Sequence, residues 1–316
     1  MKRRYLLGSL WLCIAVLLCG ILIGHLGHSK MSWDSIFERL AEKIEKSKHF
    51  NKSYSYSKSW NSEDNTTTTS EKFSFDYNLS LGSDSDRASL ENGYFVQNIE
   101  SVKVELRSIP LEVVQAEDTM IHADAFGEAE KFCTFTKYGD KLVIKERKGF
   151  GWGEKKKKAR IKLALPKDFD GKTDIESVSG SILVSRLEFD KLDIESVSGS
   201  IVLSDCKIDE LKTESVSGSQ KIDGSFDKIN AESVSGSVDF TTSKPLSKDS
   251  DFSAISGSVK LDLPKSSDYE VDYDTVSGSF RDEITGISGR KSGRSQNGKG
   301  SVKINVSTVS GSIKIQ

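Results

Sequence analysis

Glu176-Ser-Val-Ser-Gly-Ser181 is a string that the chain repeats at residues 195–200, 214–219 and 232–237. Looser copies that end in Ser-Gly-Ser follow at residues 255–258, 276–279 and 309–312. The seven glycines lie 19, 19, 18, 21, 21 and 33 residues apart. A nearly fixed period close to twenty residues is typical of a solenoid, in which one structural unit is stacked on itself.

Each repeat predicts two short strands joined by a corner. In the second unit Leu192 and Ile194 alternate with polar residues, as one face of a strand does. Farther on, Ile201 and Leu203 fall on the opposite parity. A strand cannot exchange its faces, so the chain must bend between these pairs, and Gly199 is the residue best able to make that bend.

Stacked coils would pair in parallel about 4.8 Å apart and rise roughly 34 Å over seven coils. Inward residues would form a buried column, and the corner serines would form hydroxyl ladders. The corner valines Val178, Val197, Val216 and Val234 would then align on neighbouring coils. Helix is excluded by the Ser, Thr, Val, Ile and Gly content. An antiparallel sandwich of hairpins also fits the frequent turn signals, but the regular period favours the solenoid.

The segment before the repeats alternates less regularly. Strands are predicted around Val102–Leu106, Leu111–Val113, Phe132–Tyr138, Leu142–Ile144 and Ile161–Leu165, with a tight turn at Gly139-Asp140. We interpret residues 93–166 as a β cap region and residues 167–316 as the solenoid repeats, because an open solenoid end needs a cap. Arg281–Gly300 is expected to be a mobile loop inserted into the last repeat, which Ile313–Ile315 would close.

The repeated Val-Ser-Gly-Ser strings, together with Leu165-Pro166 just before the first coil, resemble the adhesin-like DUF4097 family, whose members include LiaG-like envelope proteins of Gram-positive bacteria. The resemblance covers residues 99–316. It implies a β-solenoid fold and a place in the cell envelope, including an envelope-stress pathway. It implies no catalytic residues.

The first 92 residues predict a membrane anchor and a stalk. Residues 1–4 are a basic start placed in the cytoplasm by the positive-inside rule. Residues 5–24 are apolar and predict a transmembrane signal-anchor, since no cleavage site of the small-x-small kind follows. Residues 25–50 predict an amphipathic juxtamembrane helix, which could lie on the bilayer, pack on the solenoid or pair with a second chain. Residues 51–92 predict a Ser/Thr-rich linker. The solenoid would then lie outside the cell membrane.

Charge is unevenly distributed along a chain whose net charge is only −2. Residues 173–240 hold 14 acidic and 6 basic residues, and residues 145–162 hold 9 basic and 2 acidic ones. The second stretch contains Gly149-Phe-Gly-Trp-Gly153 and Lys155–Lys158, expected at the tip of a long hairpin. A basic loop at 149–160 suits an anionic lipid surface or an anionic envelope polymer, although charge runs also serve solubility alone. Nucleic acid is not expected as a partner outside the cell.

Acidic residues are expected to stack on the outer face of neighbouring coils. These are Asp174, Glu176, Asp193, Glu195, Glu214 and Glu232. Like charges about 5 Å apart repel, so Lys191, Lys212 and Lys228 or a divalent cation should offset them. Lysine is favoured because it is already part of the repeat, and the calcium-binding nonapeptide of other solenoids is absent.

No catalytic, cofactor-binding or metal-binding residue is predicted. The histidines His25, His28, His49 and His122 have no nucleophile or metal ligand at a useful spacing. Cys133 and Cys206 are isolated and are interpreted as buried thiols. A bridge between them would need Cα atoms within about 7 Å.

We therefore expect a membrane-anchored, non-enzymatic binding module, adhesin-like or associated with envelope stress, with an envelope polymer, a lipid surface or an envelope protein as its partner. Two alternatives stay open. A β-helical polysaccharide-active enzyme would use a carboxylate pair such as Glu176 and Glu195. A structural protein would polymerise end to end through its coils.

Overall fold

The computed structural model describes residues 87–89, 94–95, 99–127, 129–147 and 159–316. These residues are almost entirely strand, with one short helix among them. The elements are β1 (Arg87–Ser89), β2 (Tyr94–Phe95), β3 (Ser101–Leu106), β4 (Leu111–Gln115), β5 (Met120–Phe126), α3 (Ala129–Phe132), β6 (Cys133–Tyr138), β7 (Lys141–Glu146), β8 (Arg160–Leu165), β9 (Lys172–Ser177), β10 (Ile182–Ser185), β11 (Glu188–Ser196), β12 (Ile201–Ser215), β13 (Gln220–Ser233), β14 (Val238–Thr242), β15 (Ser250–Ala254), β16 (Val259–Asp262), β17 (Tyr269–Thr275), β18 (Ser279–Asp282), β19 (Ser288–Gly289), β20 (Ser292–Asn297), β21 (Val302–Thr308) and β22 (Ser312–Ile315).

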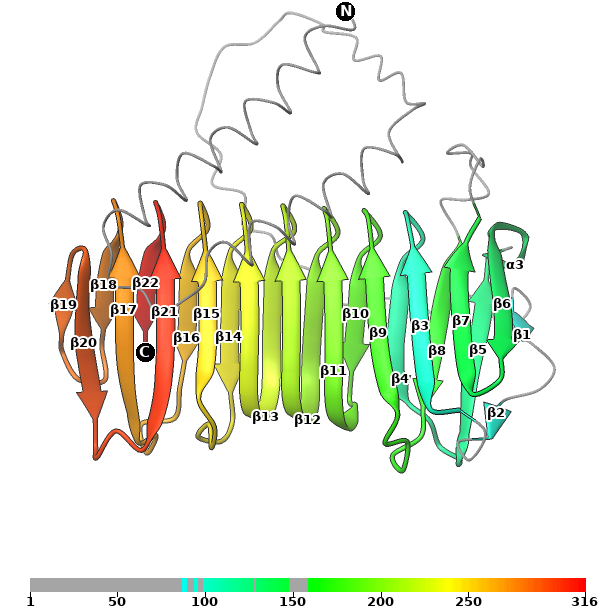
Figure 1. Cartoon of the computed structure of the whole chain (residues 1–316), viewed down its shortest axis with the longest axis horizontal. Coiled ribbons are helices and arrows are strands. Elements are labelled where there is room, and N and C mark those ends of the chain that lie inside the picture. Colours follow the sequence, from blue (N-terminus) through cyan, green and yellow to red (C-terminus); the bar gives the residue numbers. More distant parts are fainter. Residues whose placement is uncertain (1–86, 90–93, 96–98, 128, 148–158) are drawn as a thin grey trace, which may run out of the picture.

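Two parallel sheets face each other across one interior (Figure 1). In one sheet, here called the incoming sheet, strands run toward the edge that carries the repeated glycines. Its order is β7, β3, β9, β11, the second halves of β12 and β13, β15, β21 and β17. In the outgoing sheet, strands leave that edge in the order β8, β4, β10, the first halves of β12 and β13, β14, β16, β22 and β18. The row of short turns at the top of Figure 1 is the glycine edge.

The predicted corner valines align on neighbouring coils. The backbone N–H of Val197 donates to the carbonyl of Ser177 at 3.0 Å, and that of Val216 donates to Ser196 at 3.1 Å. Val234 continues the ladder. Pairing from coil to coil is parallel, so the solenoid is confirmed and the sandwich of hairpins is wrong.

Coils do not follow one another in sequence order at either end. The β3–β4 coil lies between the β7–β8 coil and the β9–β10 coil. At the other end β21–β22 lies between β15–β16 and β17–β18. The expectation that Ile313–Ile315 closes the last coil is therefore wrong, because these residues insert one coil earlier. Besides the seven coils with a glycine corner, β3–β4 and β7–β8 form two parallel coils within the region expected to be a cap.

Antiparallel strands cover the ends of both sheets. At the N-terminal end β6 pairs with β7 through the predicted turn at Gly139, whose φ is 58°, and β5 pairs with β8. At the C-terminal end β20 pairs with β17 and β19 with β18. Much of Arg281–Gly300 thus forms strands that cap the stack, and the expectation of a mobile loop is wrong. These strands satisfy backbone groups that the last coil would otherwise expose.

The interior is a continuous apolar column. The inward positions predicted from the phase change are all buried: Ile175, Ile182, Val184, Ile229, Val238, Phe240, Val259 and Leu261. In the middle coils the rings of Phe226, Phe240 and Phe252 pack against one another with tilted planes and centroids 5.5 and 5.2 Å apart. Burying each such side chain contributes about 1.5–3 kcal/mol, which is how coils that cannot fold alone stabilise one another.

The anchor expected at 5–24, the amphipathic helix at 25–50 and most of the linker at 51–92 lie outside the described residues. Within that last range, residues 87–89 form strand β1, which pairs with β5. Among the residues that are described, no helix has the length and apolar character needed to cross a bilayer.

Candidate binding surface

The glycines of the repeat are needed because neighbouring coils touch at the corner. A Cβ atom on Gly199 would lie closer than 3.0 Å to the carbonyl oxygen of Gly180, which is backbone and cannot move aside. None of the seven corner glycines has a positive φ. Their role is therefore close approach between coils, and not the bending freedom that the phase change suggested. The same overlap recurs at Gly218, Gly236, Gly257, Gly278 and Gly311.

In the four full copies of the string, the first serine of the corner points inward and bonds within its own coil. The Ser196 hydroxyl donates to the carbonyl of Gly199 at 2.7 Å, and Ser215 donates to Gly218 at 2.7 Å. These serines are buried. These four serines do not form the expected ladder of hydroxyls bonded from coil to coil, because the glycine of the same turn is the nearer partner. Bonds of the expected kind do join the hydroxyls of Ser258 and Ser312 at 3.1 Å and of Thr308 and Thr275 at 3.0 Å.

The other two serines of each corner form two columns on the surface, which we call the serine ridge. The serines of the column before the glycines are exposed, and those of the column after them are exposed or half-buried. Backbone bonds hold the corners in register, as between the N–H of Ser217 and the carbonyl of Val197 at 2.8 Å. In spatial order the first column is Ser179, Ser198, Ser217, Ser235, Ser256, Ser310 and Ser277, and the second is Ser181, Ser200, Ser219, Ser237, Ser258, Ser312 and Ser279.

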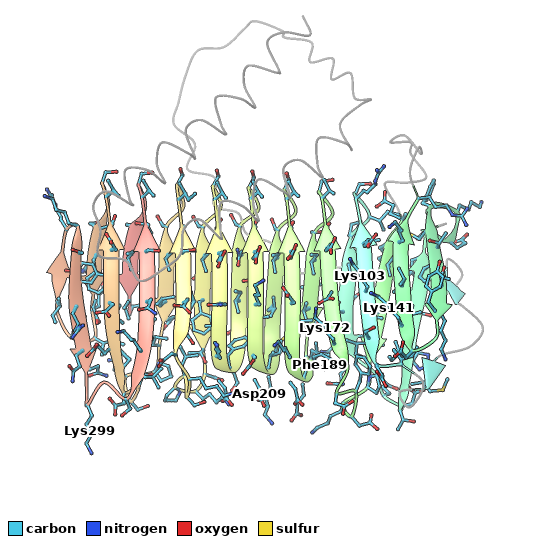
Figure 2. The ribbon with its side chains drawn as sticks, in the orientation of Figure 1. Lys103, Lys141, Lys172, Phe189, Asp209 and Lys299 are labelled. Carbon is cyan, nitrogen blue, oxygen red and sulfur yellow. The ribbon has the colours of Figure 1, made fainter. Side chains whose placement is uncertain are left out.

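A column of glutamates runs beside the ridge on the incoming sheet. It comprises Glu105, Glu176, Glu195, Glu214 and Glu232, which pair in register from β3 to β13. The adjoining column places Lys103 beside Asp174 and Lys212 beside Asp193. Figure 2 shows Lys103 and Lys172 on these N-terminal coils of the sheet.

Lysines offset the stacked carboxylates. The Nζ atom of Lys103 lies 3.1 Å from both Glu105 and Glu176. That of Lys212 lies 2.7 Å from Glu214 and 3.9 Å from Asp193. The prediction of screening by lysine is confirmed for Lys212, whereas Lys191 pairs with Glu210. Within the described residues no three His, Cys, Asp or Glu side chains are grouped closely enough to hold a metal ion.

Asp193 carries the least favourable charge of these stacked carboxylates. Burial raises the pKa of its carboxyl, Glu195, Glu214 and Asp174 act in the same direction, and Lys212 opposes them. Its Oδ1 atom is buried without a hydrogen-bond partner. The charge of Asp193 is unfavourable because the strand register places acidic residues around its carboxyl group.

The carboxylate pair of the enzyme alternative lies on the outer face of this sheet. Glu195 pairs in register with Glu176 on the next coil, and Glu176 is engaged by Lys103. A retaining or inverting glycosidase sets two carboxyl groups with different roles on either side of the scissile bond, whereas these two belong to a column of like residues repeated from coil to coil. Cys133 and Cys206 are buried reduced thiols, as expected.

A buried carboxylate replaces a glycine corner at the N-terminal end of the edge. The corner of the β3–β4 coil is Arg107-Ser108-Ile109, and the three backbone N–H groups donate to Glu146 Oε2 at 2.8, 2.9 and 3.1 Å. The Ser108 hydroxyl donates to Oε1 at 3.0 Å. Glu146 lies at the end of β7 and is 2% exposed, so it supplies the acceptors that a neighbouring corner supplies elsewhere.

The basic loop expected at 149–160 falls outside the described residues except for Ala159 and Arg160. The guanidinium of Arg160 lies 4.5 Å from the centre of the Phe126 ring. The strands on either side of the loop, β7 and β8, pair in different sheets. The expectation of a hairpin tip is therefore wrong: the chain leaves and rejoins the stack at the glycine edge.

Basic residues also lie at the C-terminal end of the glycine edge. Between β19 and β20 the chain turns at Arg290 and Lys291, both exposed, and the Lys291 carbonyl accepts the N–H of Thr275. Sequence reasoning missed this turn because the segment was interpreted as a loop. The two strands that flank the turn, β19 and β20, do not show the alternation of apolar and polar residues that predicts a strand.

The fold and the edge define a class: a capped, parallel β-solenoid with a regular polar ridge. A model of the Toastrack DUF4097 family matches residues 99–226 and 173–316. The chain belongs to this family, which confirms the resemblance seen in the sequence.

Several solved structures are similar to this chain at low identity. A putative adhesin from Bacteroides fragilis NCTC 9343 is 14% identical with a TM-score of 0.48, over 73% of this chain and 97% of that one. A putative lipid binding protein from Parabacteroides distasonis ATCC 8503 is 13% identical with a TM-score of 0.43, over 74% and 98%. A putative cell adhesion protein from Clostridium sporogenes ATCC 15579 is 15% identical with a TM-score of 0.29, over 72% and 97%. No curated protein matches the chain.

Proposed function

We propose that this protein is a non-enzymatic binding module of the cell envelope that holds an extended anionic polymer along the serine ridge. The observation that carries the proposal is the alignment of the two serine columns along the glycine edge. Each of the seven coils with a glycine corner places two serine hydroxyls at the same two positions, one coil spacing of about 4.8 Å from the next. A repeated, rigid array of donors suits a ligand that itself repeats, because each unit can make the same contact.

Charge favours one side of the ridge for an anionic chain. The glutamate column lies toward the incoming sheet and repels anions. On the outgoing sheet the row nearest the second serine column includes Lys221, Lys260, Lys314 and Arg281. Asp239 is the one acidic residue interleaved among these four cations, and it pairs with Lys260 at 3.9 Å. The polymer therefore lies toward the outgoing sheet, with Arg160 at the start of β8 at one end of the edge and Arg290-Lys291 at the other.

The proposal includes the location expected from the sequence. Residues 5–24 anchor the chain in the cell membrane in a single pass, with the solenoid on the outer side. The part of the segment at 25–92 that precedes strand β1 acts as the stalk that carries the stack away from the bilayer. An envelope-stress role and a place in a Gram-positive envelope stay proposals implied by the family resemblance.

End-to-end polymerisation is disfavoured by the caps at both ends of the stack. Antiparallel strands β5 and β6 cover the N-terminal end, and β19 and β20 cover the C-terminal end. A covered end leaves fewer unpaired strand groups with which a second copy of the chain could pair. The polysaccharide-active enzyme is the remaining alternative class.

A pull-down from envelope extracts tests the proposal. The full chain in detergent is compared with a variant in which Lys155–Lys158 are changed to Ser. We expect the native chain to recover an anionic polymer and the variant to recover less. Recovery of no polymer by the native chain would contradict the proposal, and release of sugars from the extract would favour the enzyme.

A further inference from the structure

A shallow cavity of about 420 Å³ opens on the outgoing side of the C-terminal cap. It lies over the antiparallel pair β18–β19, in which Phe280 faces Gly289 and Arg281 faces Ser288. Phe280 points inward, where its ring stacks on Tyr273 at a centroid distance of 3.8 Å. Since side chains alternate along a strand, Ser279 and Arg281 point outward. The cavity is lined by Ser279, Phe280, Arg281, Ser288, Gly289 and Arg290.

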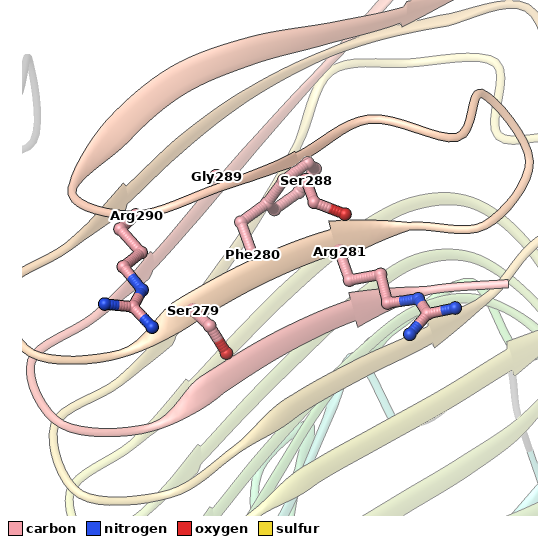
Figure 3. Close-up of a pocket in the computed structure, with 6 residues that line it drawn as sticks. All are labelled: Ser279, Phe280, Arg281, Ser288, Gly289 and Arg290. Atoms are coloured by element: carbon pink, nitrogen blue, oxygen red, sulfur yellow. The ribbon is translucent and has the colours of Figure 1, made fainter.

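Two arginines stand on either side of this cavity. Figure 3 shows Arg281 and Arg290 flanking Ser279, with Ser288 on the neighbouring strand. Arg290 comes two residues after Ser288, the cross-strand partner of Arg281. Diagonal neighbours of this kind lie roughly 7–8 Å apart at Cα, within reach of one group held between long side chains.

The positive charge of the site is only partly neutralised. Glu283 lies 3.3 Å from Arg281 Nε and 3.3 Å from Lys314 Nζ, so one carboxylate serves two cations. Arg290 forms no ion pair with any described residue, and Lys291 beside it is exposed. Guanidinium groups present planar pairs of donors that match the oxygens of a phosphate, and the two serine hydroxyls add further donors.

The cap is built rigidly around the site. Tyr273, beneath Phe280, lies so close to Gly289 and Gly293 that a Cβ atom at either position would overlap its hydroxyl. Asp282, fully buried, accepts hydrogen bonds from the hydroxyls of Tyr269 at 3.0 Å and Ser295 at 2.7 Å. β18 and the turn after it are thus fixed, and the two arginines project from a fixed frame.

The cavity continues the serine ridge. Ser279 is the last member of the second serine column, and it pairs in register with Ser312 of the next coil. A chain lying along that column toward the C-terminal cap reaches the space between the two arginines.

We propose that this cavity is an anion subsite that binds one phosphate group of an extended phosphodiester polymer. Arg281 and Arg290 clamp the phosphate oxygens, and Ser279 and Ser288 donate to the same group. This subsite deepens the proposed function and rests on it for the polymer along the ridge.

The test uses the full chain in phosphatidylcholine nanodiscs and a synthetic oligomer of phosphodiester-linked glycerol as the probe. The variant Arg281→Ser with Arg290→Ser is compared with Lys265→Ser with Lys299→Ser. The second pair removes the same charge from the same end of the stack, but from exposed lysines at the opposite edge; Figure 2 shows Lys299 there. Thermal unfolding checks that both variants stay folded.

We expect the arginine variant to bind the oligomer about tenfold to hundredfold more weakly than the native chain, and the lysine variant to stay within about twofold. Equal loss in both variants, or no loss in either, would overturn the subsite while leaving binding along the ridge intact. If the arginine variant bound phosphatidylglycerol vesicles more weakly but bound the oligomer with unchanged affinity, the polymer subsite would also be overturned. That result would point to a lipid headgroup as the ligand. If the native chain bound no oligomer but inorganic phosphate shifted the Arg281 and Arg290 guanidinium resonances, the phosphate subsite would stand and the proposed function would fail.

Discussion

The carbonyl oxygen of Gly199 occupies the space in which a Cβ atom on Gly218 would have to stand. The two residues lie at equivalent corners of adjacent coils, and neither can retreat without breaking the backbone ladder beside it. Gly218→Ala should therefore destabilise the protein by at least about 2 kcal/mol, although alanine normally suits a chain better than glycine. Denaturant unfolding measures the loss.

Ser217→Ala is the matched control, because Ser217 is the exposed neighbour of the same corner. Its effect should stay within about 0.5 kcal/mol. Equal stability of Gly218→Ala and the native chain would mean that the coils do not meet at this edge.

Glu146 should anchor the N-terminal coils. Glu146→Ala leaves three backbone N–H groups of residues 107–109 without their acceptor, at a cost of more than about 2 kcal/mol. Glu146→Gln keeps one carbonyl oxygen of the same shape and should lose less. Amide exchange at Ser108 and Ile109 is the direct readout, and it should accelerate in the alanine variant. Unchanged exchange there would show that the corner does not depend on this carboxylate.

The carboxylate of Asp193 should lower the stability of the folded protein at neutral pH, compared with an asparagine at the same position. Burial raises the pKa of its carboxyl in the folded state, so ionisation costs more there than in the unfolded chain. Below the unfolded pKa of about 3.9 the group is protonated in both states and contributes nothing. Above the folded pKa the full cost is present.

Asp193→Asn should therefore raise the melting temperature at pH 7, with a gain that shrinks to nothing as pH falls from the raised pKa to about 3.9. The exposed residue Asp209, at the opposite edge in Figure 2, gives the control Asp209→Asn, which makes the same change of charge on the surface of the stack. A melting temperature lowered at pH 7 by Asp193→Asn would mean that the Lys212 pair dominates.

The repeat predicted the parts of the fold that every coil shares. The phase change around Gly199 placed Ile194 and Ile201 on the inward side of two different strands, and both are fully buried. The stacking of Val178, Val197, Val216 and Val234 followed from the same period.

The ends could not be predicted, because any coil of the repeat can pair with any other. Nothing in the string around Gly311 distinguishes a terminal coil from the inserted position of β21–β22. β20 was missed because Ser-Gly-Arg-Ser-Gln-Asn has no apolar alternation; backbone pairing with β17 and the bond from Ser295 to Asp282 hold it. The arginine cavity was missed with it.

The sequence predicted that stacked acidic residues would be offset by lysines, but it did not predict which lysine pairs with which carboxylate. Register fixes which residues face one another, and a single sequence does not show that Lys103 from the cap region joins the repeat at Glu176. That contact depends on the insertion of the β3–β4 coil.

The serine ridge itself is tested most directly by adding negative charge to it. Ser198→Glu with Ser217→Glu places two carboxylates in the middle of the first column, and Ser243→Glu with Ser266→Glu adds the same charge to exposed serines at the opposite edge. Affinity for the phosphodiester oligomer is measured for both forms of the full chain. Binding along the ridge predicts a loss of at least about tenfold for the first pair alone; equal affinity in the two forms would contradict it.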